Sequence, residues 1–202
     1  MISSRHKFIF LHVPKTAGNA VQTYLLPHSD DQKVVHAHQD GVNRFDVRGT
    51  VTPNKHATLQ SYADRLGPRL AEFAVILPVR DPLDRALSLY FSPHRASGQP
   101  EGFVPRFDFS RFAALLDATP AIVDYARANG AIRKPDFVLR FDNLAADLGR
   151  LAAHFDLPPP ELSVLNRSLD QGGLREKLRQ DPAVIDAVRS RFGEDYAYFG
   201  FR

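Results

Sequence analysis

The sequence predicts an α/β fold whose central, mainly parallel sheet is flanked by helices. Apolar runs with the composition of buried parallel strands alternate along the chain with segments that show helical spacing of apolar residues. This alternation is typical of a three-layer arrangement, with helices on both faces of one sheet. The expected strands are 7–13, 73–79 and 137–141, and the expected helices between and after them are 19–26, 58–66 and 142–155.

The remaining segments add smaller elements to this framework. Asp81-Pro82 predicts a helix start, because aspartate is a good N-cap and proline suits the first helical position. Further expected elements are a short strand at 33–37, short helices near 110–117 and 120–129, a helix over 182–192 and an aromatic tail at 196–201. With 202 residues and no long linker, the chain is expected to form a single domain over 1–202.

Composition limits the classes of function. Hydrophobic residues make up 44% and charged residues 24%, which indicates a soluble globular protein. A net charge of +3 is too weak to indicate nucleic acid, but it suits a small anionic ligand. The absence of cysteine excludes disulfides, cysteine–zinc sites and thiol nucleophiles. No apolar run is long enough to span a membrane and no signal peptide is evident, so a cytoplasmic location is expected.

The first candidate site is the loop Pro14-Lys15-Thr16-Ala17-Gly18-Asn19-Ala20, between a predicted strand and a predicted helix. N–H groups at a helix N-terminus favour an anion, Gly18 permits close approach and unusual dihedral angles, and Lys15 and Thr16 add a charge and a hydroxyl. An ordinary strand-to-helix turn with a solvated lysine is the alternative. The loop lacks the G-x-x-x-x-G-K-[ST] pattern, and arginine follows the strand 73–79 where a metal-binding carboxylate would stand. These differences argue against a magnesium–triphosphate site.

The second candidate site is Arg80 with Ser88 in the helix that follows it. Arginine binds phosphate in a bidentate manner, and a serine hydroxyl can grip the same group. The alternative is an arginine that only pairs with Asp84 at the helix start. Ligands of parallel sheets bind beyond the carboxyl ends of the strands, so 14–20 and 80–84 are expected on the same rim.

HVPKTAG followed by PVRDPLDRALSLY strongly resembles the sulfotransferases that use 3′-phosphoadenosine 5′-phosphosulfate (PAPS), especially the branch with carbohydrate sulfotransferases. The later segments FVLRFDNLAADL, LNRS and GEDYAYFG are also similar, so the resemblance covers most of the chain and implies a P-loop-like fold. It implies that the first motif holds the 5′-phosphosulfate, the second the 3′-phosphate, and Arg167-Ser168 a further part of the nucleotide. Asn19 and Ala20 depart from the family pattern, which removes one or two hydroxyl donors. The implied donor-binding residues are Lys15, Thr16, Ala17, Gly18, Asn19, Ala20, Arg80, Ser88, Arg167 and Ser168.

The resemblance implies sulfuryl transfer to an acceptor hydroxyl, with a carbohydrate as the expected acceptor. Lys15 would stabilise the charge on the leaving phosphate, and a histidine would act as general base, with no metal and no nucleic acid involved. The family's spacing before the arginine favours His56 as the base, and His36 and His38 are second choices. Other small-molecule acceptors remain open. The alternatives are a P-loop kinase-like phosphotransferase and a catalytically inactive nucleotide-binding protein.

Overall fold

A computed structural model describes residues 1–35, 45–92, 106–161 and 173–202. Contacts within the chain divide it into two compact units. Unit 1 consists of Met1–Val79 and Ile122–Asn166, and unit 2 of Arg80–Ala121 and Arg167–Arg202. The two units are described in turn.

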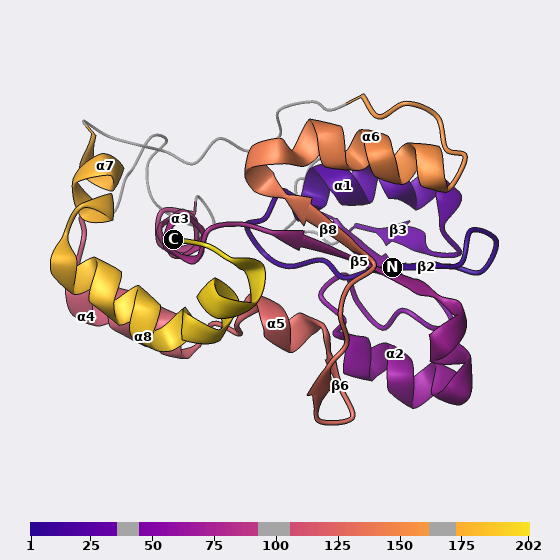
Figure 1. The fold of residues 1–202 in the computed structure, drawn as a ribbon, viewed down its shortest axis with the longest axis horizontal. Coiled ribbons are helices and arrows are strands. Elements are labelled where there is room, and N and C mark those ends of the chain that lie inside the picture. The colour runs from indigo at the N-terminus through magenta and orange to yellow at the C-terminus, as the bar shows by residue number, and fades with distance from the viewer. Residues whose placement is uncertain (36–44, 93–105, 162–172) are drawn as a thin grey trace. The chain divides into compact units, whose positions relative to one another are not determined.

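Unit 1 contains a four-stranded sheet in the order β1-β2-β5-β8 (Figure 1). β1 runs antiparallel to β2, whereas β2, β5 and β8 are parallel, with Phe8 opposite Ala74 and Ile76 opposite Phe137. All of β2 and nearly all of β5 are buried, as their continuous apolar sequences predict. The predicted mainly parallel α/β sheet is therefore confirmed. Its strands are β1 (Ile2–Ser3), β2 (Phe8–Phe10), β5 (Ala74–Val79) and β8 (Phe137–Arg140).

Helices cover both faces of this sheet, which gives the three layers predicted from the sequence. Helices α1 (Gly18–Leu25) and α6 (Leu144–His154) lie on one side, and α2 (Leu59–Leu66) lies on the other (Figure 1). The apolar stripes of α1 and α6 share a core with side chains from β2, β5 and β8. That core includes Phe8, Phe10, Val21, Leu25, Ile76, Leu139, Leu148 and Leu151.

Two small antiparallel hairpins complete unit 1. β3 (Gln32–Val34) pairs with β4 (Asp46–Arg48), and β6 (Arg127–Ala128) pairs with β7 (Ala131–Ile132). The helix expected at 120–129 is wrong in its second half, because α5 (Ile122–Tyr125) stops early and β6 follows. Asn129 and Gly130 have φ values of 52° and 79°, and this left-handed pair makes the tight turn between β6 and β7. Short 3₁₀ helices span Leu26–His28, Gly67–Glu72 and Phe141–Asn143.

Unit 2 is helical in its described part, with α3 (Pro82–Tyr90), α4 (Phe109–Asp117), α7 (Leu174–Arg179) and α8 (Pro182–Phe199). Three of these helices begin at a capping aspartate: Asp81 accepts from Asp84 N at 3.0 Å, Asp108 from Arg111 N at 2.8 Å, and Asp181 from Ala183 N at 2.9 Å. The predicted start at Asp81-Pro82 is confirmed.

The expected aromatic tail at 196–201 is instead mostly helical. Helix α8 has non-helical angles at Phe192, continues to Phe199 and ends at Gly200, whose φ is 67°. Phe192 and Phe199 are both buried, which favours continuation of the helix past its kink.

Candidate functional site: the loop before α1 and the histidine beside it

The loop at 14–20 follows β2 and leads into α1. Lys15 and Ala17 have φ values of 69° and 65°, in the left-handed region that few non-glycine residues occupy. Ala17 is the N-cap of α1, provides no side-chain hydrogen bond, and no acidic residue lies in the first turn. The aspartate caps of α3, α4 and α8 are thus replaced here by an alanine and a nearby lysine. The positive end of α1 is therefore suited to receive an anion.

Gly18 packs directly against the ring of His12. A Cβ atom built on Gly18 would lie 2.3 Å from His12 Cδ2 and 2.4 Å from His12 Nε2, far inside contact distance. The expectation of unusual dihedral angles at Gly18 is wrong, since the left-handed residues are Lys15 and Ala17, and the close approach of the Gly18 backbone to an anion stays a prediction. Glycine is needed at this position for space.

His12 is held in place from α1. Its Nδ1 donates to Gln22 Oε1 at 2.6 Å, and both residues are buried. Burial lowers the pKa of His12 well below its usual value, and the neighbouring His56 and Lys55 lower it further. The His12 ring is therefore neutral at physiological pH and acts as a rigid support under the start of α1.

Two other predicted loop residues have their polar groups occupied within the loop. Thr16 is fully buried and its hydroxyl donates to Val13 O at 2.8 Å. Ala20 N donates to Ala17 O at 3.0 Å, inside the helical hydrogen-bond ladder. In this conformation an anion would meet the Lys15 side chain and the earlier N–H groups of the loop. The roles of Thr16, Asn19 and Ala20 in nucleotide binding stay predictions.

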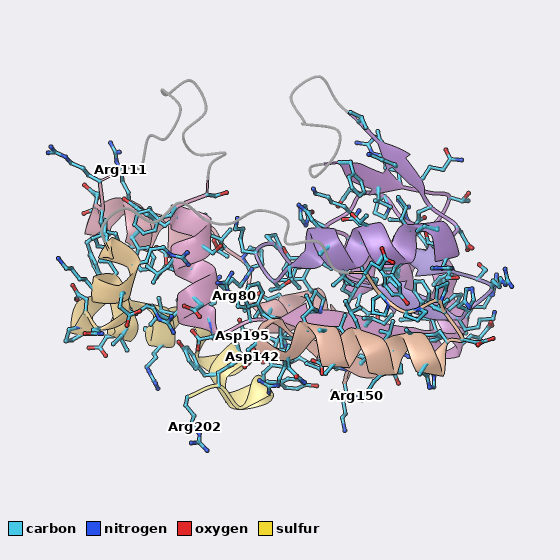
Figure 2. The ribbon with its side chains drawn as sticks, turned by 90° about the horizontal axis from the view of Figure 1, so that it is seen from above. Arg80, Arg111, Asp142, Arg150, Asp195 and Arg202 are labelled. Atoms are coloured by element: carbon cyan, nitrogen blue, oxygen red, sulfur yellow. The ribbon has the colours of Figure 1, made fainter. Side chains whose placement is uncertain are left out.

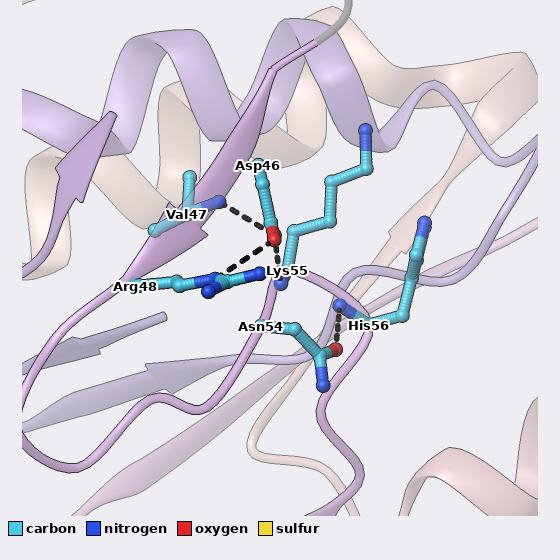
Figure 3. Close-up of polar contacts among 6 residues, drawn as sticks. All are labelled: Asp46, Val47, Arg48, Asn54, Lys55 and His56. Carbon is cyan, nitrogen blue, oxygen red and sulfur yellow. Dashed lines mark hydrogen bonds and ion pairs between the residues drawn. The ribbon is translucent and has the colours of Figure 1, made fainter. Parts of the chain in front are cut away.

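His56 lies in the turn before α2 and is connected to the strand end that carries the loop. Its backbone N–H donates to Asn54 Oδ1 at 2.9 Å (Figure 3), and its Nδ1 donates to His12 O at 3.0 Å. Because a carbonyl oxygen can only accept, this bond assigns the proton to Nδ1 and leaves the lone pair on Nε2. The His12 and His56 rings meet edge to face, with their centroids 4.8 Å apart.

The surroundings of His56 keep it neutral. Burial lowers its pKa most, and the Lys55 cation lowers it too, while the hydrogen bond to the His12 carbonyl and the Asp46 carboxylate raise it. The net effect is a pKa below the usual value, so the imidazole is unprotonated at pH 7. A neutral histidine with its lone pair on Nε2 can accept a proton from a bound hydroxyl.

In unit 2, Arg80 directly follows β5 and precedes α3 (Figure 2). Burial lowers the pKa of its guanidinium, Asp84 and Asp81 raise it, and Arg175 and Arg179 lower it. Asp84 also forms an ion pair with Arg179, with 3.4 Å between Oδ1 and Nε. Arg80, Arg175 and Arg179 therefore bring three guanidinium groups near the start of α3, where Asp81 and Asp84 also lie.

Ser88 lies on the buried side of α3. It is 1% exposed, and Arg85, one turn earlier, donates to Pro120 O at 3.0 Å and lies over the Phe192 ring at 5.8 Å. The helix face with Arg85 and Ser88 therefore packs inside unit 2, as does the face with Leu87. The role of Ser88 in phosphate binding stays a prediction.

Other predicted site residues lie outside the described residues: His36, His38, Arg167 and Ser168. Within the described ranges, no group of three or more histidine or acidic side chains could hold a metal ion. Within the same ranges, no helix is both long and apolar enough to cross a membrane.

Three residues of this site were missed from the sequence: Gln22, Asp46 and Lys55. Gln22 had a usable signal, because a polar residue between Val21 and Leu25 interrupts the apolar face of α1. Asp46 and Lys55 had none, since their importance depends on contacts between segments apart in the chain.

Comparison with known proteins gives the family of the chain. A family model described as the sulfotransferase family matches residues 1–202. No curated protein and no solved structure matches the chain. The match covers the full sequence, including the loop before α1 and the Arg80 segment, and the chain belongs to the sulfotransferase family.

Proposed function

We propose that this protein transfers a sulfuryl group from PAPS to an acceptor hydroxyl, with a carbohydrate as the expected acceptor. The observation that carries the proposal is the hydrogen bond from His56 Nδ1 to His12 O. It connects a neutral histidine base to the strand end from which the anion-binding loop begins. A base and an anion site side by side are what sulfuryl transfer to a hydroxyl requires.

The residues present suit the phosphosulfate end of the donor. The N-terminus of α1 has no acidic cap, Lys15 supplies a charge, and Gly18 lets the start of α1 pack against the buried His12 ring. The guanidinium groups of Arg80, Arg175 and Arg179 suit a second phosphate group, which is the 3′-phosphate in this proposal. Arg167, Ser168 and Ser88 are proposed to complete the nucleotide site.

Each proposed catalytic residue has one task. The donor supplies a sulfuryl group attached to a phosphate that leaves as an anion. Lys15 stabilises the negative charge that develops on the leaving oxygen, together with the N-terminus of α1. His56 accepts the acceptor hydroxyl proton at Nε2, and its Nδ1 bond to His12 O stabilises the imidazolium that forms.

A titration with 3′,5′-adenosine bisphosphate, 5′-AMP and ATP, all without magnesium, tests the donor site. We expect the bisphosphate to bind most tightly. Replacing Arg80 by alanine should weaken its binding by roughly 10- to 100-fold, since hydrogen bonds to charged groups contribute about 1.5–3 kcal/mol. In Arg80→Ala, binding of 5′-AMP should change little, because 5′-AMP lacks the 3′-phosphate. Arg111→Ala is the matched control, because this arginine is exposed on α4 (Figure 2). Equal binding of ATP and the bisphosphate would contradict the proposal.

Transfer from radiolabelled PAPS to a panel of sugars, phenols and lipids tests the reaction. We expect His56→Ala to keep nucleotide binding and to lose at least about 100-fold in turnover, the usual range for loss of a general base. His154→Ala is the control, since this histidine is exposed on α6. Turnover of ATP with magnesium would favour a phosphotransferase, and binding without any transfer would favour an inactive nucleotide-binding protein.

A further inference from the structure

Asp46 is the first residue of β4 and connects this strand to the turn that carries His56. It is 9% exposed, and its carboxylate accepts three hydrogen bonds (Figure 3). Val47 N and Lys55 N both donate to Oδ1 at 2.8 Å, while Arg48 Nε donates to Oδ2 at 3.1 Å. One carboxylate therefore fixes the backbone of the residue next to His56.

The two oxygens of Asp46 have different partners, which separates two possible roles. Oδ1 accepts from the backbone N–H groups of Val47 and Lys55, so it acts as a brace for the turn. Oδ2 binds Arg48, whose side chain is 55% exposed. An asparagine at position 46 can keep the brace through its own Oδ1, but it loses the negative charge and the ion pair with Arg48.

The titratable groups described around His56 come from three segments. Lys55 lies next to it in the same turn, the Asp46 carboxylate of β4 accepts from Lys55 N, and the neutral His12 ring meets it from the end of β2. Among these groups Asp46 is the anion, and its charge favours the imidazolium form against burial and the Lys55 cation. Burial raises the pKa of Asp46 itself, but its hydrogen bonds from Lys55 N, Val47 N and Arg48 outweigh this and hold the pKa below its usual value. Asp46 therefore remains charged at neutral pH.

We propose that Asp46 is a positioning residue for His56: its Oδ1 braces the turn through the backbone of Lys55, and its carboxylate places a negative charge beside that turn. The catalytic part of this inference rests on the proposed function of His56. The geometric part rests on the contacts of Asp46 with Val47 N and Lys55 N, and the electrostatic part on the charge of this braced carboxylate and its effect on the His56 pKa.

The titration of His56 by NMR tests the charge effect without any acceptor. The His56 ring signal is identified by its loss in His56→Ala and followed in wild type, Asp46→Asn and Arg48→Gln. We expect a lower His56 pKa in Asp46→Asn, because the anion is gone while the brace remains. Arg48→Gln is the matched control: it removes the same ion pair but keeps the anion, so the His56 pKa should stay the same or rise. An unchanged pKa in Asp46→Asn, or an equal fall in Arg48→Gln, would overturn the proposal.

Turnover as a function of pH tests the catalytic consequence. The acid limb of kcat should move to lower pH in Asp46→Asn and keep its place in Arg48→Gln. Asp46→Ala, which also loses the brace, should reduce kcat by roughly 10- to 100-fold while donor KM changes little, because misplacing a catalytic group costs about this much. Thermal unfolding of each variant verifies that it is folded.

The outcomes separate the two proposals. If His56→Ala keeps full turnover while Asp46→Asn still lowers the His56 pKa, His56 is not the base, and Asp46 acts on it only electrostatically. If His56→Ala abolishes turnover but Asp46→Asn leaves both the NMR titration and the acid limb unchanged, the proposal for Asp46 is wrong and that for His56 stands.

Discussion

Replacing Gly18 by alanine should damage the loop, although the same change stabilises most helices. The added Cβ would lie 2.3 Å from His12 Cδ2, 2.4 Å from Nε2 and 3.1 Å from Cγ. His12 cannot easily move away, because it is buried and its Nδ1 is bonded to Gln22 Oε1 at 2.6 Å. Either the ring must leave this bond or the start of α1 must shift.

The expected magnitude follows from two opposing effects. Alanine in a helix is favoured over glycine by about 1 kcal/mol. Overpacking a filled core costs typically about 1–3 kcal/mol, and a contact this short belongs at the upper end. We therefore expect a net loss of about 1–2 kcal/mol in the free energy of unfolding. Gly149→Ala is the control: this glycine is exposed on α6, nothing lies within 4 Å of its Cβ position, and the change should stabilise.

Urea unfolding of both variants and titration with 3′,5′-adenosine bisphosphate measure the effect. Gly18→Ala should lower the urea midpoint and weaken nucleotide binding, while Gly149→Ala should leave binding unchanged. The double variant with His12→Ala provides a further check, since the added methyl group should cost less once the ring is gone. Unchanged stability and binding in Gly18→Ala would refute the steric argument.

Three further predictions concern stability, measured by urea unfolding. The free energy of unfolding should fall as pH drops below about 6.5, because the pKa values of His12 and His56 are lowered in the folded state and the unfolded chain binds protons more readily; a flat profile from pH 7 to 5 would contradict this. Ala17→Gly should stabilise by up to about 1 kcal/mol by relieving a left-handed alanine, whereas Ala17→Val should destabilise. Asp81→Ala should cost about 1 kcal/mol through loss of the α3 cap, and an unchanged midpoint would refute that role.

The sequence predicted the central sheet because its strands have local signals. β5 is a continuous apolar run that is buried on both faces, and Asp81-Pro82 defines the next helix start through contacts within a few residues. The end of α8 could not be predicted in this way. Its last turns bury Phe199, and a local sequence pattern does not reveal this burial.

In the candidate site, too, the parts with a local sequence signal were predicted and the parts that depend on contacts between separate segments were not. The loop at 14–20 was found because its chemistry lies in one short segment. The sequence did not reveal the contact that requires glycine at position 18, since the ring it accommodates belongs to His12 at the preceding strand end. Asp46 was missed because its carboxylate acts on Lys55 N, nine residues away across a turn.

The alanine cap of α1 has a practical consequence for handling this protein. A helix end without its own carboxylate does not distinguish a substrate from any other oxyanion that fits. Sulfate from precipitation steps and phosphate from buffers would compete with the donor, raising the apparent KM and the melting temperature together. Kinetic measurements on this protein therefore require buffers without oxyanions. A sulfate titration gives an inexpensive measure of the affinity of the loop for an anion before any acceptor is known.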